Sequence, residues 1–381
     1  MDATPRCRLR DLGIAPGTLP PGRWNAITDV EGVRVGHATA IEGDGVRSGV
    51  TSIVPHAGNP YRERVPAALF VGNGFGKLVG ATQLRELGEL ETPVLLTNTM
   101  AVFRVAEALA EWTLALPGND QVLSVNPVVG ETNDGRLNDI RARGVTAAHA
   151  RAALADARDG PVAGGNVGAG TGTMAFGLKG GIGSASRALP PGDGGYVVGA
   201  LVQANFGGDL RVAGLEVGRA LRERAGQGAG SGRPAAAPAP ADPSPAASDA
   251  DGSIMIVLAT DAPLSSRDLE RLAARAMAGL ARTGAAMSDG SGDYAIAFST
   301  ALDVRRPVAG GVRRGPPPAR TLRELDHADL SPLFLAAIEA TEEAILDALC
   351  LAETMRGHRG RVAEALPLEE VRRLAAGRGH G

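Results

Sequence analysis

The chain has 381 residues, a mass of 38.8 kDa, a formal net charge of −3 and a pI near 6.1. This charge balance gives no basic footprint for nucleic acid or an anionic membrane surface. Its two cysteines, Cys7 and Cys350, form no CxxC pair, so no disulfide scaffold, metal site or cofactor is expected. The start lacks a signal-peptide core and no apolar run reaches the roughly 20 residues of a membrane span, which predicts a cytoplasmic protein.

The first half alternates short apolar runs with two Ala-rich segments. The pattern predicts strands near 33–37, 49–54, 67–71 and 93–97, and helices near 102–114 and 147–157. Residues 72–77 look like a phosphate-binding loop, but Val71 and Leu78 occupy the Gly and Ser/Thr positions that a P-loop needs. This loop could still contribute backbone amides to a pocket.

A dense polar cluster fills residues 131–139 after an apolar stretch at 122–129. It is either a solvated turn rich in Asx residues or one wall of a substrate pocket. In the second interpretation Glu131 and Asn133 would contact the substrate. The cluster alone does not separate the two.

Residues 164–173 are rich in glycine, and 170–175 fit the looser dinucleotide pattern G-x-G-x-x-A. The strand before it and the acidic residue after it are missing, so no nucleotide cofactor is expected. We interpret it instead as a turn whose N–H groups, at Gly168 and Gly170, point at a developing negative charge or at the linker. An apolar strand at 196–205 then delivers Asn205, whose amide could donate to an oxyanion or cap the next turn.

Residues 224–251 are almost entirely Ala, Gly, Pro, Ser and Asp, a composition that predicts a disordered linker. The next residues, Gly252 and Ser253, open an apolar β-branched stretch to Thr260 that predicts a buried strand. Cleavage between them would give Ser253 a hydroxyl nucleophile and a free amine of pKa roughly 8 to act as its base. On these two residues alone, an ordinary Gly-Ser turn between linker and strand is the favoured interpretation, and the case for cleavage depends on the rest of the chain.

The last third contains two helices around one polar strand entry. A helix is predicted from a Ser265 cap, with Asp268 three residues on, to about Arg282, and a long one starts at Ser331. Between them, Ser291 and Asp293 stand two apart at a strand entry, which points both to one face. They could form a proton relay to a nucleophile on a neighbouring strand, or simply a turn.

These pieces together resemble the P1 family (S58-type, DmpA-like) of self-processing N-terminal aminopeptidases, which includes the β-peptidyl aminopeptidases. The resemblance rests on Gly252-Ser253 after a tether, the loop at 166–173, Asn205 and the 291–293 turn, and it covers nearly the whole chain. It implies a four-layer αββα sandwich, like N-terminal-nucleophile hydrolases but with different connectivity. It also implies a homo-oligomer, commonly a tetramer.

By this resemblance Ser253 is the nucleophile and new N-terminus, Ser291 and Asp293 form the relay, and Asn205 is the oxyanion donor. Members carry Glu where this chain has Asp293, and the missing methylene shortens its reach. They also carry an aromatic hydroxyl near the pocket. Arg136 stands in the polar cluster where that hydroxyl would be sought.

The sequence therefore predicts one hydrolase domain over 1–381 that cleaves itself into residues 1–252 and 253–381. The expected reaction releases N-terminal residues from short peptides, amides or esters, with Glu131 as a candidate partner of the substrate ammonium. Two alternatives stay open. One is an acyltransferase of the ornithine acetyltransferase type, whose members use Thr as nucleophile; the other is a non-catalytic binding protein of the same fold.

Overall fold

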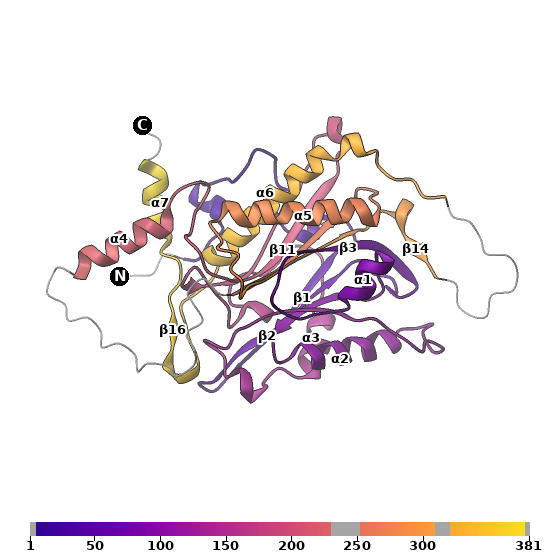
Figure 1. Cartoon of the computed structure of the whole chain (residues 1–381), viewed down its shortest axis with the longest axis horizontal. Helices are drawn as coiled ribbons and strands as arrows, with labels where there is room; N and C mark the ends of the chain where they lie inside the picture. The colour runs from indigo at the N-terminus through magenta and orange to yellow at the C-terminus, as the bar shows by residue number, and fades with distance from the viewer. Residues whose placement is uncertain (1–4, 230–251, 309–320, 378–381) are drawn as a thin grey trace, which may run out of the picture.

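A computed structural model describes residues 5–229, 252–308 and 321–377. Two β-sheets lie face to face between two layers of helices (Figure 1). The larger sheet has the order β10 (Gly181–Ala188), β11 (Val197–Asn205), β12 (Ser253–Thr260), β13 (Gly292–Ser299), β3 (Glu63–Gly74) and β14 (Arg306–Pro307), with β5 (Glu89–Leu90) also on β3. The smaller sheet has the order β1 (Arg34–Glu42), β2 (Val46–Val54), β6 (Val94–Asn98), β7 (Val128–Thr132) and β4 (Leu78–Val79).

The outer layers are pairs of long helices. Helices α5 (Ser266–Arg282) and α6 (Ser331–Cys350) cover the larger sheet, and α2 (Val102–Leu114) and α3 (Ala147–Ala155) cover the smaller one (Figure 1). Other elements include α1 (Ala81–Leu87), α4 (Val217–Ala229), α7 (Leu368–Gly377) and the hairpins β8 (Met174–Ala175)–β9 (Leu178–Lys179) and β15 (Met355–Arg356)–β16 (Val362–Ala363). The expected four-layer αββα sandwich is confirmed.

Strand β12 shows how the layers are specified by alternation. Ile254, Ile256 and Leu258 face α5 and α6, whereas Met255 and Val257 face the other sheet. All eight residues of the strand are buried, which explains why its sequence is apolar without a polar face. Each fully buried aliphatic side chain of this kind contributes about 1.5–3 kcal/mol. Ser253, the first residue of β12, lies on the same face as Met255 and Val257, which points between the two sheets.

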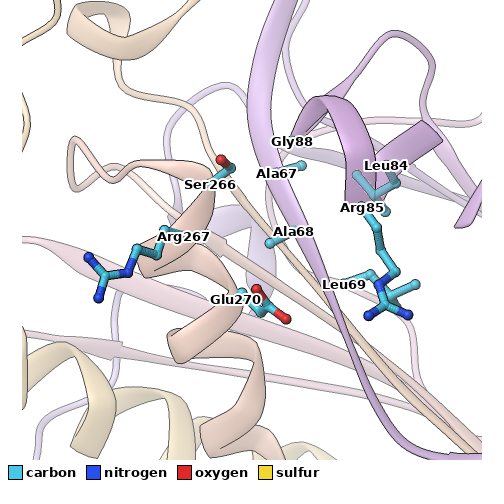
Figure 2. A pocket seen from close by; sticks show the side chains of 9 residues that line it. All are labelled: Ala67, Ala68, Leu69, Leu84, Arg85, Gly88, Ser266, Arg267 and Glu270. Atoms are coloured by element: carbon cyan, nitrogen blue, oxygen red, sulfur yellow. The ribbon is translucent and has the colours of Figure 1, made fainter. Parts of the chain in front are cut away.

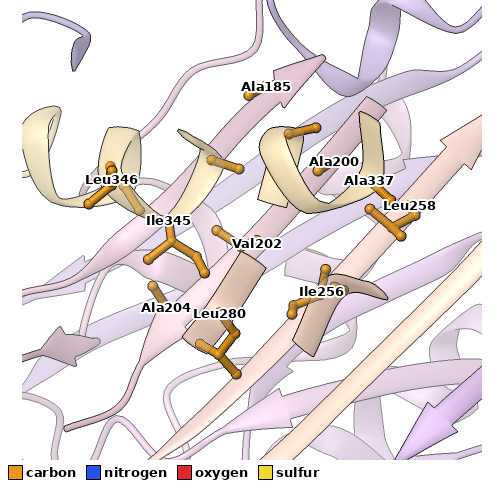
Figure 3. Packing of buried hydrophobic residues seen from close by; sticks show 14 of the residues in the cluster. Ala185, Ala200, Val202, Ala204, Ile256, Leu258, Leu280, Ala337, Ile345 and Leu346 are labelled. Carbon is orange, nitrogen blue, oxygen red and sulfur yellow. The ribbon is translucent and has the colours of Figure 1, made fainter. Parts of the chain in front are cut away.

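Small residues let α6 lie close to the larger sheet (Figure 3). A Cβ at Gly183 would lie 1.8 Å from the carbonyl oxygen of Ala344, so a side chain there would push the helix away. Figure 3 shows Leu346, Ile345 and Ala337 of α6 over the strands that carry Ala200 and Val202. The abundance of Ala and Gly over aromatic residues thus reflects close helix-on-sheet contact.

The predicted helices and strands are confirmed in position, with one boundary error. Helix α2 spans the predicted residues, and Ser265 Oγ accepts the Asp268 N–H as the cap of α5. The predicted linker began too early, because α4 continues to Ala229 and so includes residues 224–229. Arg219 of that helix pairs with Glu223 one turn on and with Glu216 just before the helix, a contribution that composition alone did not reveal. The rest of the predicted linker, 230–251, lies outside the described residues.

Helices long and apolar enough to span a bilayer are absent from the described ranges 5–229, 252–308 and 321–377.

Candidate active site

Ser253 lies at the point where three strands begin or end. It pairs with Asn205, the last residue of antiparallel β11, and with Gly292, the first residue of parallel β13. Its side-chain hydroxyl donates to the carbonyl oxygen of Gly252 at 2.7 Å. The Gly292 N–H lies 3.2 Å from that same carbonyl oxygen and 3.2 Å from Ser253 Oγ. One amide therefore polarises the Gly252 carbonyl while the hydroxyl stands beside it.

Gly252 is the residue that this close approach requires. A Cβ at this position would lie 2.3 Å from the carbonyl oxygen of Asn205 and 2.4 Å from Phe206 Cα. Both atoms belong to backbone, which cannot rotate away as a side chain could. The neighbouring strand thus excludes a side chain immediately before Ser253.

Ser291 and Asp293 meet beside this point, as their spacing predicted. Ser291 Oγ donates to Asp293 Oδ1 at 2.6 Å, and both residues are 1% exposed. Gly292, whose amide reaches Ser253, lies between them in the chain. Asp293 Oδ2 is buried and has no hydrogen-bond partner within the described residues. Burial raises the pKa of the Asp293 carboxyl, and the hydrogen bond from Ser291 opposes this with a smaller effect.

The side chain of Asn205 is held at both ends. Its Oδ1 accepts the Met174 N–H at 3.0 Å, and its Nδ2 donates to the carbonyl oxygen of Asn133 at 3.1 Å. The Asn133 side chain itself accepts the Gly135 N–H at 2.9 Å in an Asx turn. The polar cluster at 131–139 is thus partly the predicted turn and partly a support for Asn205.

Glu131 enters the site from the other sheet. A Cβ at the preceding Gly130 would lie 2.4 Å from the methyl carbon of Met255, so β7 crosses β12 close to Ser253. The Glu131 carboxylate is 4% exposed. It accepts the Lys77 N–H at 2.9 Å and the Thr99 hydroxyl, and Lys77 Nζ lies 3.9 Å away. A buried carboxylate with an exposed ammonium beside it can exchange that partner for a ligand's ammonium.

The glycine-rich turn corrects one expectation. Gly168 and Gly170 are buried, and their N–H groups donate to Thr39 Oγ1 and to the carbonyl oxygen of Val167. Neither amide is left to bind a ligand, so Gly168 and Gly170 do not supply oxyanion donors as the composition of the turn had suggested. It packs instead between the sheets, where Gln203 Nε2 binds the Ala169 carbonyl oxygen at 2.9 Å.

Three further residues join the site; none was a predicted site residue, although the loop at 72–77 was expected to offer backbone amides. Asn73 Nδ2 donates to the carbonyl oxygens of Ser288, Asp289 and Ser291, and so holds the turn that carries Ser291. Lys77, from the same loop, contributes the amide to Glu131. Tyr294 is 6% exposed, and a Cβ at Gly76 would lie 3.5 Å from its hydroxyl and 3.4 Å from Glu131 Oε1. Two sequence features could have pointed to these residues: the segment 72–77, which resembles a P-loop but lacks its required residues, and the aromatic residue directly after Asp293.

A separate cavity of about 290 Å³ lies between β3, α1 and α5 (Figure 2). It is lined by Ala67, Ala68 and Leu69 of β3, whereas the register places Gly74 of that strand opposite Gly292. Five or more residues of extended chain therefore separate it from Ser253, roughly 17 Å or more. In Figure 2 the Arg267 guanidinium extends away from the other labelled side chains. This cavity does not belong to the cluster around Ser253.

Comparison with known proteins gives consistent matches over the whole chain. The model of peptidase family S58 matches residues 25–363. The chain belongs to peptidase family S58. Two proteins named beta-peptidyl aminopeptidase BapA, from Sphingosinicella xenopeptidilytica and Sphingosinicella microcystinivorans, are 39% and 41% identical over 97% of this chain and over 91% and 93% of their own lengths. Family S58 membership makes the chain a serine aminopeptidase or amidase.

Solved structures of the family share the fold closely. A Burkholderia sp. beta-aminopeptidase is 44% identical with a TM-score of 0.84, covering 98% of this chain and 99% of its own. The L-aminopeptidase D-Ala-esterase/amidase from Ochrobactrum anthropi, described as a variant among the Ntn hydrolase fold, is 36% identical with a TM-score of 0.83, covering 99% of both chains. The S58 chain is therefore a mixed α/β protein of that fold variant.

Proposed function

We propose that this S58 aminopeptidase cleaves itself between Gly252 and Ser253, and that Ser253 is the nucleophile of the mature enzyme. The observation that carries the proposal is the shared Gly292 amide, 3.2 Å from both the Gly252 carbonyl oxygen and Ser253 Oγ. A hydroxyl and a polarised carbonyl are thus adjacent within one chain. Such proximity replaces a bimolecular encounter with an internal step.

Self-cleavage then follows in two steps. Ser253 Oγ loses its proton and bonds to the Gly252 carbonyl carbon, while the Gly292 N–H stabilises the oxygen's negative charge. The bond from that carbon to the Ser253 nitrogen breaks, the nitrogen takes up a proton, and an ester remains. Water hydrolyses the ester and leaves a Gly252 carboxylate, a free Ser253 hydroxyl and a free Ser253 amine.

In turnover the same groups act on a substrate with a free N-terminus. Glu131 binds the substrate ammonium, Ser253 Oγ attacks the carbonyl carbon, and the Asn205 amide and Gly292 N–H bind the oxyanion. Either the Ser253 amine or Ser291, bonded to Asp293, moves the proton. The leaving amine or alcohol takes up that proton and departs, and water then hydrolyses the acyl-enzyme to release the acid and restore the Ser253 hydroxyl.

The substrates we propose are short peptides, amides or esters with a free N-terminal amine, including β-amino-acid amides. Relatives named beta-peptidyl aminopeptidases support the proposal of β-amino-acid substrates. The relative named L-aminopeptidase D-Ala-esterase/amidase supports the proposal of α-amino-acid substrates. We also propose a homo-oligomer, a tetramer of processed heterodimers. Exposed apolar side chains at Phe75, Met100, Phe103 and Leu123 support it, and light scattering on the purified protein tests it.

Intact mass under denaturing conditions tests the function, with Ser253→Ala measured in parallel. The wild type should give two chains of about 26 and 13 kDa, scaled from 252 and 129 residues. The variant should give one chain of 38.8 kDa. N-terminal sequencing of the small chain should begin at Ser253, and the cleaved enzyme should hydrolyse α- or β-aminoacyl amides.

Three outcomes contradict this proposal in different ways. A single uncleaved and inactive wild-type chain favours the binding-protein alternative. Cleavage in Ser253→Ala assigns the nucleophile elsewhere. Transfer of the acyl group to an added amine, with no hydrolysis in water, favours the acyltransferase alternative.

A further inference from the structure

The orientation of the Asn205 amide is fixed by two backbone groups. Because Oδ1 accepts from Met174 and Nδ2 donates to Asn133, the two ends of the amide cannot exchange without losing both hydrogen bonds. An amide nitrogen carries two hydrogens, and the Asn133 carbonyl takes one of them. The other hydrogen is available to a ligand at the end of β11, where Asn205 pairs with Ser253.

The Asn133 carbonyl and the Met174 N–H clamp the two ends of the Asn205 amide. The first clamp, the Asn133 carbonyl, is held in place by a buried carboxylate. Asp134 follows Asn133 directly and is 1% exposed. It accepts Ser48 Oγ at 2.6 Å and Asn138 Nδ2 at 2.9 Å, and Ser48 Oγ in turn accepts Asn98 Nδ2 at 2.8 Å. These partners tie the Asn133 carbonyl to β2 and β6 of the smaller sheet.

The second clamp, the Met174 N–H, is held in place by a buried ammonium. Lys179 pairs with Met174 across the β8–β9 hairpin and has no exposed surface. Its Nζ donates to the carbonyl oxygens of Gly170 and Gly180, both at 2.9 Å. The hairpin that presents the Met174 N–H is therefore fixed to the glycine-rich turn.

The two anchors act on each other across that turn. A Cβ at Gly172 would lie 3.0 Å from Asp134 Cβ, and Gly170 is bound by Lys179. The charge of Asp134 raises the pKa of Lys179 against the larger lowering by burial. Burying two ionisable side chains costs free energy that two apolar side chains would not cost, and burial raises the pKa of Asp134 to about 7 and lowers that of Lys179 to about 7. Their retention next to both clamps calls for a role beyond packing.

We propose that Asp134 and Lys179 are paired positioning residues that orient the Asn205 amide toward the oxyanion. Each fixes one end of that amide, Asp134 through Asn133 and Lys179 through Met174. The inference rests on the proposed function, in which Asn205 donates to the oxyanion. Neither residue touches the substrate, so both act on the reaction through Asn205.

A double-mutant cycle with Asn205→Ala tests this route. Asp134→Asn and Lys179→Met should each lower kcat by about tenfold, with KM nearly unchanged, in the wild-type background. In the Asn205→Ala background the same substitutions should change kcat by less than about twofold, because the residue they position is gone. Rates are expressed per cleaved chain.

Glu339→Gln is the matched control, since Glu339 on α6 is also a 1% exposed carboxylate but is held by Arg187 of β10. It should lower stability without changing kcat in either background. If Asp134→Asn fails to fold, Ser48→Ala removes one partner of Asp134 and should show the same dependence on Asn205, to a smaller extent.

Equal losses of kcat in both backgrounds, or a rise in KM alone, would overturn the positioning role while leaving the proposed function intact. No loss in the wild-type background would have the same meaning. An uncleaved, inactive wild-type chain would instead overturn the proposed function, and this inference with it.

Discussion

Lys179 on β9 and Arg187 on β10 are both fully buried cations, eight residues apart in the chain, but they are held in different ways. Arg187 is paired with carboxylates, since its Nε lies 3.0 Å from Glu339 and its Nη2 lies 2.8 Å from Glu343. Lys179 is held by two carbonyl oxygens, and burial lowers its pKa to about 7.

The difference follows from what each cation fixes. Around Arg187, the carboxylates of α6 also bind the N-terminal segment: Glu339 accepts the N–H groups of Thr18 and Leu19, and Glu343 accepts from Arg10. This cluster joins the chain start to α6 and stabilises the fold. Around Lys179, the groups that are held lead to Asn205 and Ser253. The guanidinium of Arg187, which is paired with carboxylates, thus stabilises the fold. The ammonium of Lys179, which is bound by carbonyl oxygens, has the positioning role that we propose at the active site.

The largest expected effect is on stability, at Arg187. In the uncleaved Ser253→Ala background, Arg187→Met should lower the free energy of unfolding by about 3–5 kcal/mol, because it leaves the buried Glu339 carboxylate without its cation and Glu343 with Arg10 alone. Denaturant unfolding measures it. Arg151→Met is the control, since Arg151 pairs with Glu111 at the surface with 55% and 60% of the side chains exposed, and should change stability by less than about 1 kcal/mol. A loss at Arg187 no larger than at Arg151 would contradict the structural role.

The next largest effect is on catalysis, at Asn205. Asn205→Ala should lower kcat by about 10²–10³-fold, or about 2.7–4 kcal/mol of transition-state stabilisation, because it removes one oxyanion donor. Steady-state kinetics on an aminoacyl amide measure it. An unchanged kcat would leave the Gly292 N–H as the principal donor and remove the reason for the Asp134 and Lys179 anchors.

A smaller effect is expected on substrate binding, at Glu131. Glu131→Gln keeps an acceptor for the Lys77 amide but loses the charge that binds a substrate ammonium, so KM should rise by about 10–100-fold, or about 1.5–3 kcal/mol. Glu42→Gln, at an exposed position of β1, is the control and should leave KM unchanged. If kcat falls at Glu131 while KM is constant, Glu131 acts on the chemical step instead.

The smallest effect is the pH dependence of stability at Asp293. Burial raises its pKa, so the folded state binds more protons than the unfolded state above the ordinary aspartate pKa of about 3.9. Stability should therefore fall as pH rises through the raised pKa, and this loss should be absent below the unfolded value. In the Ser253→Ala background, Asp293→Asn should remove that slope. An identical slope with and without Asp293 would show that the carboxyl is not destabilised by burial.

Local sequence determined the secondary structure and the outline of the site. Continuous apolar runs defined β12 and β11, the Ser265 cap placed the start of α5, and two-residue spacing brought Ser291 and Asp293 to one hydrogen bond. These features depend on neighbours within a few residues, which a sequence displays directly. Helix α4 was not predicted, and its residues 224–229 were assigned to the linker because they have the composition of a linker.

Tertiary structure alone decided which distant groups meet. Asn73 reaches the carbonyl of Ser291, Asn133 reaches Asn205, and the Gly292 amide reaches the Gly252 carbonyl, because strands far apart in the chain are neighbours in or across the sheets. The same contacts turned the glycine-rich residues 168–170 from expected oxyanion donors into a buried spacer. Backbone N–H groups carry no sequence signal of their direction, since every residue but proline has one, and only the folded chain assigns each its partner.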